Sequence, residues 1–454
     1  MTKRFGGVAV LVAGAMALAG CSTVGAVGSA AGRLNPFKKD APQETATDGR
    51  RISIVAFDQS IEAAEGLKGA DFYLPVALPQ AEWPQAGGVP DQMVEHVEAA
   101  PNFEVAWRRG FGKGSDRAFH ITASPILANG RVYVMDAASE VAAMDARTGQ
   151  VIWRKSVHAR NKRDKHGFGG GVAFADGKLY VASGFRVVAQ LDAATGELGW
   201  RRETAAPIHG APIVSHGRVF VVSTDNELLT FDAASGAPGW TFQALVESAR
   251  ILSSSSPAAS GDTVVAAFAS GEMVALRAAN GNDLWNNTLA KASRTSALSE
   301  IRDVAGRPVI YRGEVYAASH GGVFAATDLR TGQARWSLPV ASINSPWPAG
   351  DVVYVVSQAG ELICASRDSG QVYWIRDLNA GVKKAKNRAM FSGPVLASDR
   401  LVVVSSDGRA IAVNPKTGEV LKTIKLGGPA LVAPVAAGGM IYVVTDKGDL
   451  VAIG

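Results

Sequence analysis

One pattern, Asp-x-x-Thr-Gly-x-x-x-Trp, recurs along most of this chain and decides which folds are open to it. "MDARTGQVIW" (144–153) returns as "LDAATGELGW" (191–200) and "FDAASGAPGW" (231–240). A tryptophan stands four residues after a glycine in the pairs Gly149/Trp153, Gly196/Trp200, Gly236/Trp240, Gly281/Trp285, Gly332/Trp336 and Gly370/Trp374. A further copy keeps Gly418 and has Lys422 in place of the tryptophan. A spacing of roughly 45 residues indicates a fold made of repeated units.

Each repeat contains apolar runs that predict four short strands. A proline-bearing run such as "ITASPIL" (121–127) precedes a hairpin such as "NGRVYVMDAASEVAAMD" (129–145), and the turn and tryptophan follow. Four strands in about 45 residues make one blade of a β-propeller. The predicted fold is therefore all-β, an eight-bladed propeller of four-stranded antiparallel blades, with units near 128, 175, 215, 260, 311, 348, 397 and 436. A β-solenoid is the structural alternative.

The two ends of the repeat region predict how the ring closes. The final stretch "GGMIYVVTDKGDLVAIG" (438–454) lacks a fourth strand, whereas "NFEVAW" (102–107) carries Trp107 in step with the repeat. We expect this N-terminal strand to complete the last blade. The innermost strand of a blade has a free edge, where proline is tolerated. We place six prolines there: Pro125, Pro212, Pro257, Pro346, Pro394 and Pro434.

The repeated turn has a physical reading. Glycine takes a positive φ in a short hairpin loop, and the aspartate before it accepts hydrogen bonds from backbone amides of the turn. The tryptophan on the outer strand fills the wedge between neighbouring blades, burying about 150–250 Å². Every blade has the same gap, so the same residues return.

The N-terminus predicts a lipid-anchored, exported protein. Residues 1–20 combine Lys3 and Arg4 with a short apolar run and are typical of a signal peptide. "LAGC" ends this leader and resembles the bacterial lipobox, which implies lipidation of Cys21, and Ser22 after it implies sorting to the outer membrane on its periplasmic face. An ordinary secretory leader is the alternative. Residues 21–50 read as a flexible tether, 51–100 as an extended arm packed on the propeller with Trp83 as its anchor, and 101–454 as the propeller.

The repeats resemble those of pyrroloquinoline-quinone (PQQ) enzymes, and leader, lipobox and eight units together resemble the BamB family of outer-membrane assembly lipoproteins. The resemblance implies a non-enzymatic scaffold of the β-barrel assembly (BAM) complex, without cofactor or metal and monomeric by itself, that binds the periplasmic POTRA domains of BamA. The 51–100 segment departs from the family pattern, so its role stays open.

The same resemblance points to two loops as the partner-binding site. They are "VESARILSSSSP" (246–257) and "SEIRDVAGRP" (299–308), which precede consecutive units and so emerge side by side. Exposed apolar residues beside arginine make a plausible interface core. The candidate contacts are Arg250, Ile251, Leu252, Arg302, Asp303 and Val304. Loops that merely cover the ends of blades are the alternative.

Other functions find less support in the residues. A PQQ-dependent dehydrogenase would resemble relatives that use a disulfide of neighbouring cysteines and a calcium site, but the only cysteine besides Cys21 is Cys364, which we expect to be buried in a strand. A carbohydrate-binding propeller would need exposed aromatic residues, and Trp83 and Trp347 are the tryptophans outside the repeat. The basic loop 158–166 and "KKAKNR" (383–388) are read as solvated surface. A net charge of +5 argues against nucleic acid.

Overall fold

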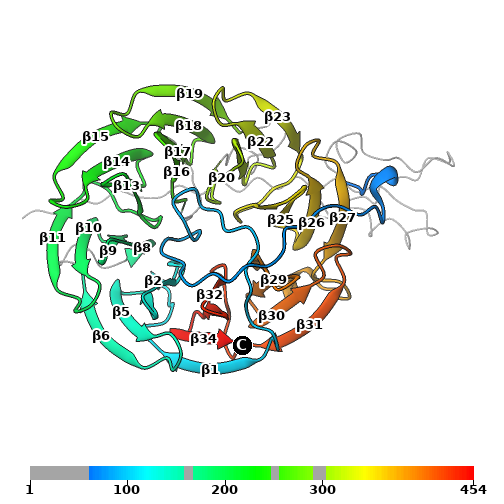
Figure 1. The fold of residues 1–454 in the computed structure, drawn as a ribbon, viewed down its shortest axis with the longest axis horizontal. Coiled ribbons are helices and arrows are strands. Elements are labelled where there is room, and N and C mark those ends of the chain that lie inside the picture. Colours follow the sequence, from blue (N-terminus) through cyan, green and yellow to red (C-terminus); the bar gives the residue numbers. More distant parts are fainter. Residues whose placement is uncertain (1–60, 158–166, 247–254, 290–302) are drawn as a thin grey trace, which may run out of the picture. The chain divides into compact units, whose positions relative to one another are not determined.

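The computed structural model describes residues 61–157, 167–246, 255–289 and 303–454. Eight four-stranded antiparallel sheets stand as blades around a central channel (Figure 1). This confirms the predicted eight-bladed propeller and shows that the solenoid alternative is wrong. The leader, the lipobox Cys21 and the tether fall outside the described residues. In the part of the chain described, no helix has the length and apolar character needed to cross a membrane.

In each blade the strands follow one another in chain order from the channel to the rim, except that β1 takes the outermost place in blade eight. The innermost strands are β3 (Ile126–Ala128), β8 (Gly170–Ala175), β12 (Ile213–Ser215), β16 (Ala258–Ser260), β20 (Val309–Tyr311), β24 (Trp347–Ala349), β28 (Phe391–Ala397) and β32 (Val435–Ala437). The second strands are β4 (Arg131–Met135), β9 (Lys178–Ser183), β13 (Arg218–Val222), β17 (Thr263–Ala267), β21 (Glu314–Ala318), β25 (Val352–Val356), β29 (Arg400–Ser405) and β33 (Met440–Val444).

The outer half of each blade holds the repeated turn. The third strands are β5 (Glu140–Asp145), β10 (Val187–Asp192), β14 (Glu227–Asp232), β18 (Glu272–Arg277), β22 (Phe324–Asp328), β26 (Glu361–Ser366), β30 (Arg409–Val413) and β34 (Asp449–Ile453). The outermost strands are β6 (Val151–Ser156), β11 (Leu198–Glu203), β15 (Pro238–Gln243), β19 (Asp283–Thr288), β23 (Ala334–Leu338), β27 (Val372–Asp377), β31 (Val420–Lys425) and β1 (Val105–Gly110). Outside the blades lie the parallel pair β2 (Phe119–His120) and β7 (Gly167–Phe168) and the 3₁₀ turns η1 (Glu65–Leu67) and η3 (Ala385–Asn387).

The core lies between the blades. The second strands, such as "VVYVV" in β25, are buried on both faces because each blade is covered by a neighbour on either side. The outermost strands are mostly exposed apart from their tryptophans. The six predicted prolines sit at the innermost strands: Pro394 lies inside β28, and the other five each stand immediately before a strand, where no ladder hydrogen bond is lost.

Ring closure follows the prediction. β1 pairs antiparallel with β34, so that the N-terminal strand is the outermost strand of blade eight (Figure 1). At the seam between blades seven and eight, Lys422 replaces the repeat tryptophan. Its Nζ donates to the carbonyl oxygen of Asn102 at 3.1 Å and to Glu104 Oε1 at 3.0 Å. In blade eight the third and fourth strands, β34 and β1, come from opposite ends of the repeat region, so no repeated turn joins them to receive a tryptophan.

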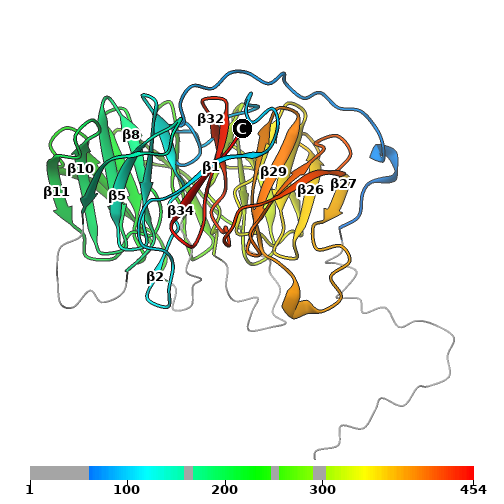
Figure 2. The same ribbon diagram turned by 90° about the horizontal axis from the view of Figure 1, so that it is seen from below.

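The arm supplies hydrogen-bond partners for backbone groups at the inner edges of the blades. Residues 61–100 lie across one face of the propeller, opposite the face that carries β2 (Figure 2). The backbone of Trp83 exchanges two hydrogen bonds with Leu127 of blade one, at 2.7 and 2.9 Å. Trp83 is 1% exposed and stacks on Trp347, with ring centroids 6.2 Å apart. The tryptophan that the sequence singles out in this segment is thus buried at the mouth of the channel.

From Trp83 the arm passes round the channel and meets each blade in turn. Pro84 O accepts from Phe174 N of blade two, and the Gln85 side chain bonds both backbone groups of Val214 in blade three. Hydrogen bonds to the remaining five blades then pair Pro90 with Ala259, Asp91 with Ile310, Glu95 with Trp347, Val97 with Leu396 and Ala100 with Gly439. The arm thereby caps free edges that face the channel.

Candidate functional site

The residues predicted to bind a partner divide into two groups. Arg250, Ile251, Leu252 and Arg302 lie outside the described residues. Asp303 and Val304 are described and are buried, at 2% and 0% exposure. Asp303, expected at the edge of a contact surface, is therefore inside the fold in this structure, and its neighbour Val304 joins the apolar core between blades four and five.

Backbone hydrogen bonds hold this segment in place. Asp303 O accepts from His320 N at 2.8 Å, and Val304 N donates to Phe268 O at 3.3 Å. Phe268 follows β17 of blade four and His320 follows β21 of blade five, so the middle of the 299–308 loop is tied to both blades. Asp303 and Val304 fix the course of this loop rather than offer their side chains to solvent.

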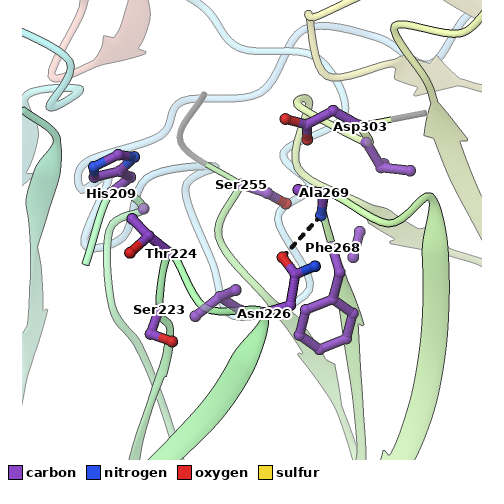
Figure 3. A pocket seen from close by; sticks show the side chains of 12 residues that line it. His209, Ser223, Thr224, Asn226, Ser255, Phe268, Ala269 and Asp303 are labelled. Carbon is purple, nitrogen blue, oxygen red and sulfur yellow. Dashed lines mark hydrogen bonds between the residues drawn. The ribbon is translucent and has the colours of Figure 1, made fainter. Parts of the chain in front are cut away.

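The two predicted loops meet at one junction. Ser255, near the end of the first loop, and Asp303, in the middle of the second, line the same small hollow with Asn226 of blade three (Figure 3). Gly210 lets Ser255 pack against blade three, because a Cβ there would lie 2.1 Å from Ser255 O. The described parts of the two loops are thus adjacent. The hollow, about 40 Å³, has room for little more than a water molecule.

Two polar side chains that the sequence reading missed hold the start of the first loop. Asn226 Nδ2 donates to Leu245 O at 2.6 Å, and Glu272 Oε2 accepts from Leu245 N at 2.6 Å. Asn226 also accepts from Ala269 N at 3.2 Å, which links blades three and four (Figure 3). Neither side chain belongs to a recognisable motif. The sequence offers one sign of a special role: Asn226 stands in the tight turn "TDNE", and asparagine tolerates a positive φ better than most residues. In the structure its φ is 59°.

The held segment presents apolar side chains to solvent. Leu245 is 66% exposed and Val246 is 74% exposed, and they directly precede the predicted contact residues. Ile343, Met390 and Leu431 are also exposed, each just ahead of an innermost strand of a later blade. Exposed apolar residues grouped on one face are typical of interaction surfaces.

The structure also places the residues on which the alternatives depend. Cys364 is fully buried in β26, as expected, and burial raises its pKa well above the usual value. Trp83 and Trp347, the aromatic residues that a carbohydrate site would need exposed, are buried against each other. Within the described ranges, no three His, Cys, Asp or Glu side chains gather as metal ligands would. "KKAKNR" forms the exposed η3 turn, and the basic loop 158–166 lies outside the described residues.

Comparison with known proteins adds the family. The family described as outer membrane protein assembly factor BamB matches residues 137–376 and 380–454, well over half of the chain. The chain belongs to the BamB family. The BamB proteins of Salmonella typhimurium and Escherichia coli K12 are each 27% identical over 354 residues, covering 77% of this chain and 88% of theirs. BamB of Burkholderia pseudomallei is 26% identical, with coverage of 78% and 89%.

Solved structures agree on the fold. BamB from Moraxella catarrhalis superposes on this BamB-family chain with a TM-score of 0.64 and 19% identity, covering 76% of this chain and 99% of its own. A europium-containing methanol dehydrogenase has a TM-score of 0.65 and 16% identity, with coverage of 80% and 89%. The β-propeller domain of glucose, ethanol and alcohol dehydrogenases also matches residues 96–175. Because assembly factors and dehydrogenases share this architecture, the fold alone does not choose between them.

Proposed function

We propose that this BamB-family chain is a non-enzymatic scaffold of the outer-membrane β-barrel assembly complex. Acyl chains on Cys21 hold it at the periplasmic face of the outer membrane, and it binds the periplasmic POTRA domains of BamA to support folding and insertion of outer-membrane proteins. Family membership supports the general role. The observation that carries the site is the junction where Ser255 of the first loop and Asp303 of the second line one hollow.

The contact surface has an apolar centre in this proposal. Leu245 and Val246 are exposed at the start of the first loop, and the apolar residues Ile251 and Leu252 follow in the same loop after residues 247–250. Arg250 and Arg302 supply charge around it. Asp303 and Val304 act indirectly, because their burial fixes the course of the second loop. Apolar anchors with arginine nearby are the residues that dominate binding free energy at protein interfaces.

The test is co-purification with BamA from detergent-solubilised envelopes. The variant Arg250→Glu/Ile251→Asp introduces a repulsive charge and removes an apolar anchor, so capture of BamA should fall at least about thirtyfold. Asp303 stays unchanged, because replacing a buried residue would confuse misfolding with lost binding. Leu198→Asp, on the exposed outer strand β11, is the matched control and should capture BamA normally. Normal capture by a folded Arg250→Glu/Ile251→Asp protein would refute this site.

A PQQ-dependent dehydrogenase is the second candidate, because the dehydrogenase propeller domain matches part of the chain. The PQQ enzymes that this sequence resembles use a pair of neighbouring cysteines. Here Cys364 is alone in a buried strand, and Cys21 lies in the lipobox. Dye reduction by the purified chain with PQQ, calcium and an alcohol would establish this activity and overturn the scaffold proposal. We expect no reduction above a protein-free control.

A further inference from the structure

A cavity of about 330 Å³ occupies the central channel. Its polar wall includes Thr122, Arg307, Asn344, Ser345 and Ser392, which stand just before or at the start of the innermost strands of four different blades. The arm crosses the other face of the propeller (Figure 2), at the far ends of those strands. The channel is therefore closed by the arm on one side and hollow on the other.

Arg307 is fixed in this wall by its backbone. Its amide donates to Ser345 Oγ at 3.0 Å. Gly306 before it packs so closely on blade six that a Cβ would lie 2.4 Å from Asn344 O. The chain on either side of the Arg307 Cα atom thus has little freedom, and the side chain is positioned from a rigid base.

The guanidinium of Arg307 has no counter-ion in the described part of the chain. No described carboxylate lies within ion-pair distance of it, and its buried Nε has no hydrogen-bond partner. Burial lowers the pKa of Arg307 to about 10, so the group remains charged at neutral pH. A partly buried cation without a counter-ion is unfavourable, and a bound anion would compensate this cost.

Thr122, in blade one across the channel from blade five, lines the same cavity, but its Oγ1 is covered by protein atoms and makes no hydrogen bond. A guanidinium offers two parallel N–H donors to a planar anion. The apolar side chains of Ile121, Phe168 and Val432 form other parts of the wall. The cavity thus suits an anionic head joined to an apolar body.

One carboxylate in the wall selects between anions. Asp446 also lines the cavity, and its Oδ1 already accepts from Ser115 Oγ at 3.1 Å. Negative charge on this side chain repels a doubly charged phosphate more than a singly charged carboxylate. We propose that the channel cavity is a binding site for a small apolar carboxylic acid, held by Arg307 through both carboxylate oxygens. Arg307 belongs to the 299–308 loop but is not one of the residues proposed to contact BamA.

Isothermal titration calorimetry on the full mature chain in detergent tests the site, with benzoate as the probe. Benzoate should bind saturably, and benzamide, a neutral analogue of similar shape, at least tenfold more weakly. Arg307→Gln should weaken benzoate binding at least tenfold, and Arg307→Lys should weaken it less, because an ammonium keeps the charge but loses the paired donors. Arg330→Gln, at an exposed turn on the rim, is the control and should bind as the wild type does.

The outcomes separate cleanly. An absence of saturable benzoate binding by the wild type overturns the site, as does equal affinity in the folded Arg307→Gln variant. Tighter binding of inorganic phosphate than of benzoate overturns the assignment to carboxylic acids. Unfolding temperature supplies an independent readout: without ligand, Arg307→Gln should unfold at a temperature no lower than the wild type, because it removes an unpaired cation. Benzoate should raise the unfolding temperature of the wild type and of Arg330→Gln but not that of Arg307→Gln.

Discussion

The indole ring of Trp153 occupies the space that a Cβ atom on Gly196 would need: the two would be 2.8 Å apart. Trp153 is the repeat tryptophan of blade one and Gly196 is the turn glycine of blade two. The indole Nε1 also donates to Ala193 O of the same turn at 3.2 Å. The glycine and the tryptophan of the repeat therefore touch across blades, and each of blades one to six is joined to the next by an indole hydrogen bond and a ring packed on bare backbone.

Gly196→Ala should cost more than backbone strain alone. Its φ of 74° disfavours any side chain by about 1–2 kcal/mol, and displacing the Trp153 ring adds an overpacking penalty of about 1–3 kcal/mol. Gly177→Ala is a matched control, because its φ is 73° and a Cβ there meets nothing within 4 Å. Urea unfolding should show Gly196→Ala to be the less stable of the two. Equal losses would mean that the close packing contributes nothing.

Trp83→Ala should destabilise the arm and with it the channel mouth. The side chain is almost wholly buried and stacks on Trp347, so its loss should cost about 3–5 kcal/mol. Leu78→Ala, in the same arm but 62% exposed, should change stability by less than about 0.5 kcal/mol. Limited proteolysis should cleave residues 61–100 faster in Trp83→Ala. A protection pattern like that of the wild type would contradict the anchoring role.

Deleting residues 101–110 should destabilise the whole ring, because blade eight loses β1 and β34 gains an unpaired edge. Lys422→Ala breaks only the exposed contacts to Asn102 and Glu104 and should cost no more than about 1 kcal/mol. Thermal unfolding distinguishes the two changes. An unaltered unfolding temperature in the deletion protein would refute closure by the N-terminal strand.

Acid should weaken the repeated turns. Two hydrogen bonds hold the carboxyl pKa of Asp145 and of Asp328 below the usual 3.8. The larger effect comes from the hydroxyl of a threonine in the turn, and the next from the backbone amide of the same threonine. A carboxyl group whose pKa is lower in the folded than in the unfolded state stabilises the protein at a pH above its unfolded-state pKa. This stability is lost as the pH falls through the folded-state pKa. The unfolding free energy should therefore decline as the pH falls below about 4.

The double variant Asp145→Asn/Asp328→Asn isolates this effect. Asparagine keeps an acceptor oxygen, as Asn414 shows in the corresponding turn of blade seven, where its Oδ1 accepts from Lys416 N and Thr417 N. The variant should fold normally and lose less stability than the wild type between pH 5 and pH 3. Parallel acid profiles for the two proteins would show that these carboxylates do not contribute.

Cys21→Ala should release the chain from the outer membrane, because acylation of this residue is the proposed anchor. Fractionation of the cell envelope measures this directly. Signal-peptide cleavage and outer-membrane retention equal to the wild type would require another means of attachment.

The repeat made the propeller predictable because a fixed tryptophan and glycine imply one recurring gap, and the unmatched strand ending in Trp107 implied closure. The arm was harder to foresee. Its residues interact through backbone carbonyls of Pro84, Pro90 and Asp91, and backbone groups leave no trace in residue identity. Pro348 shows the difficulty: it has no N–H to offer at the position where other blades bond to the arm, and blade six uses the indole of Trp347 instead.

The site was predictable only in its position along the chain. Consecutive units implied that the two loops are neighbours, and their described parts are adjacent. The burial of Asp303 was not foreseen, since an acidic residue in a polar loop ordinarily faces solvent. Here the next residue, Val304, enters the core and takes the aspartate below the surface with it. Arg307 was not predicted as a site residue, because nothing in the sequence shows that a cation lacks a partner.

The course of the arm imposes an order on folding. Residues 83–100 make hydrogen bonds to blades one through eight in succession, and β1 completes the eighth blade with the last strand of the chain. During synthesis the arm and β1 are made before any of the blades to which they bond. Residues 83–97 can bond blades one to seven as each of these forms, but Ala100 and β1 need the strands of blade eight, which come last in the chain. The seam at blade eight is therefore the last part of the ring that can close.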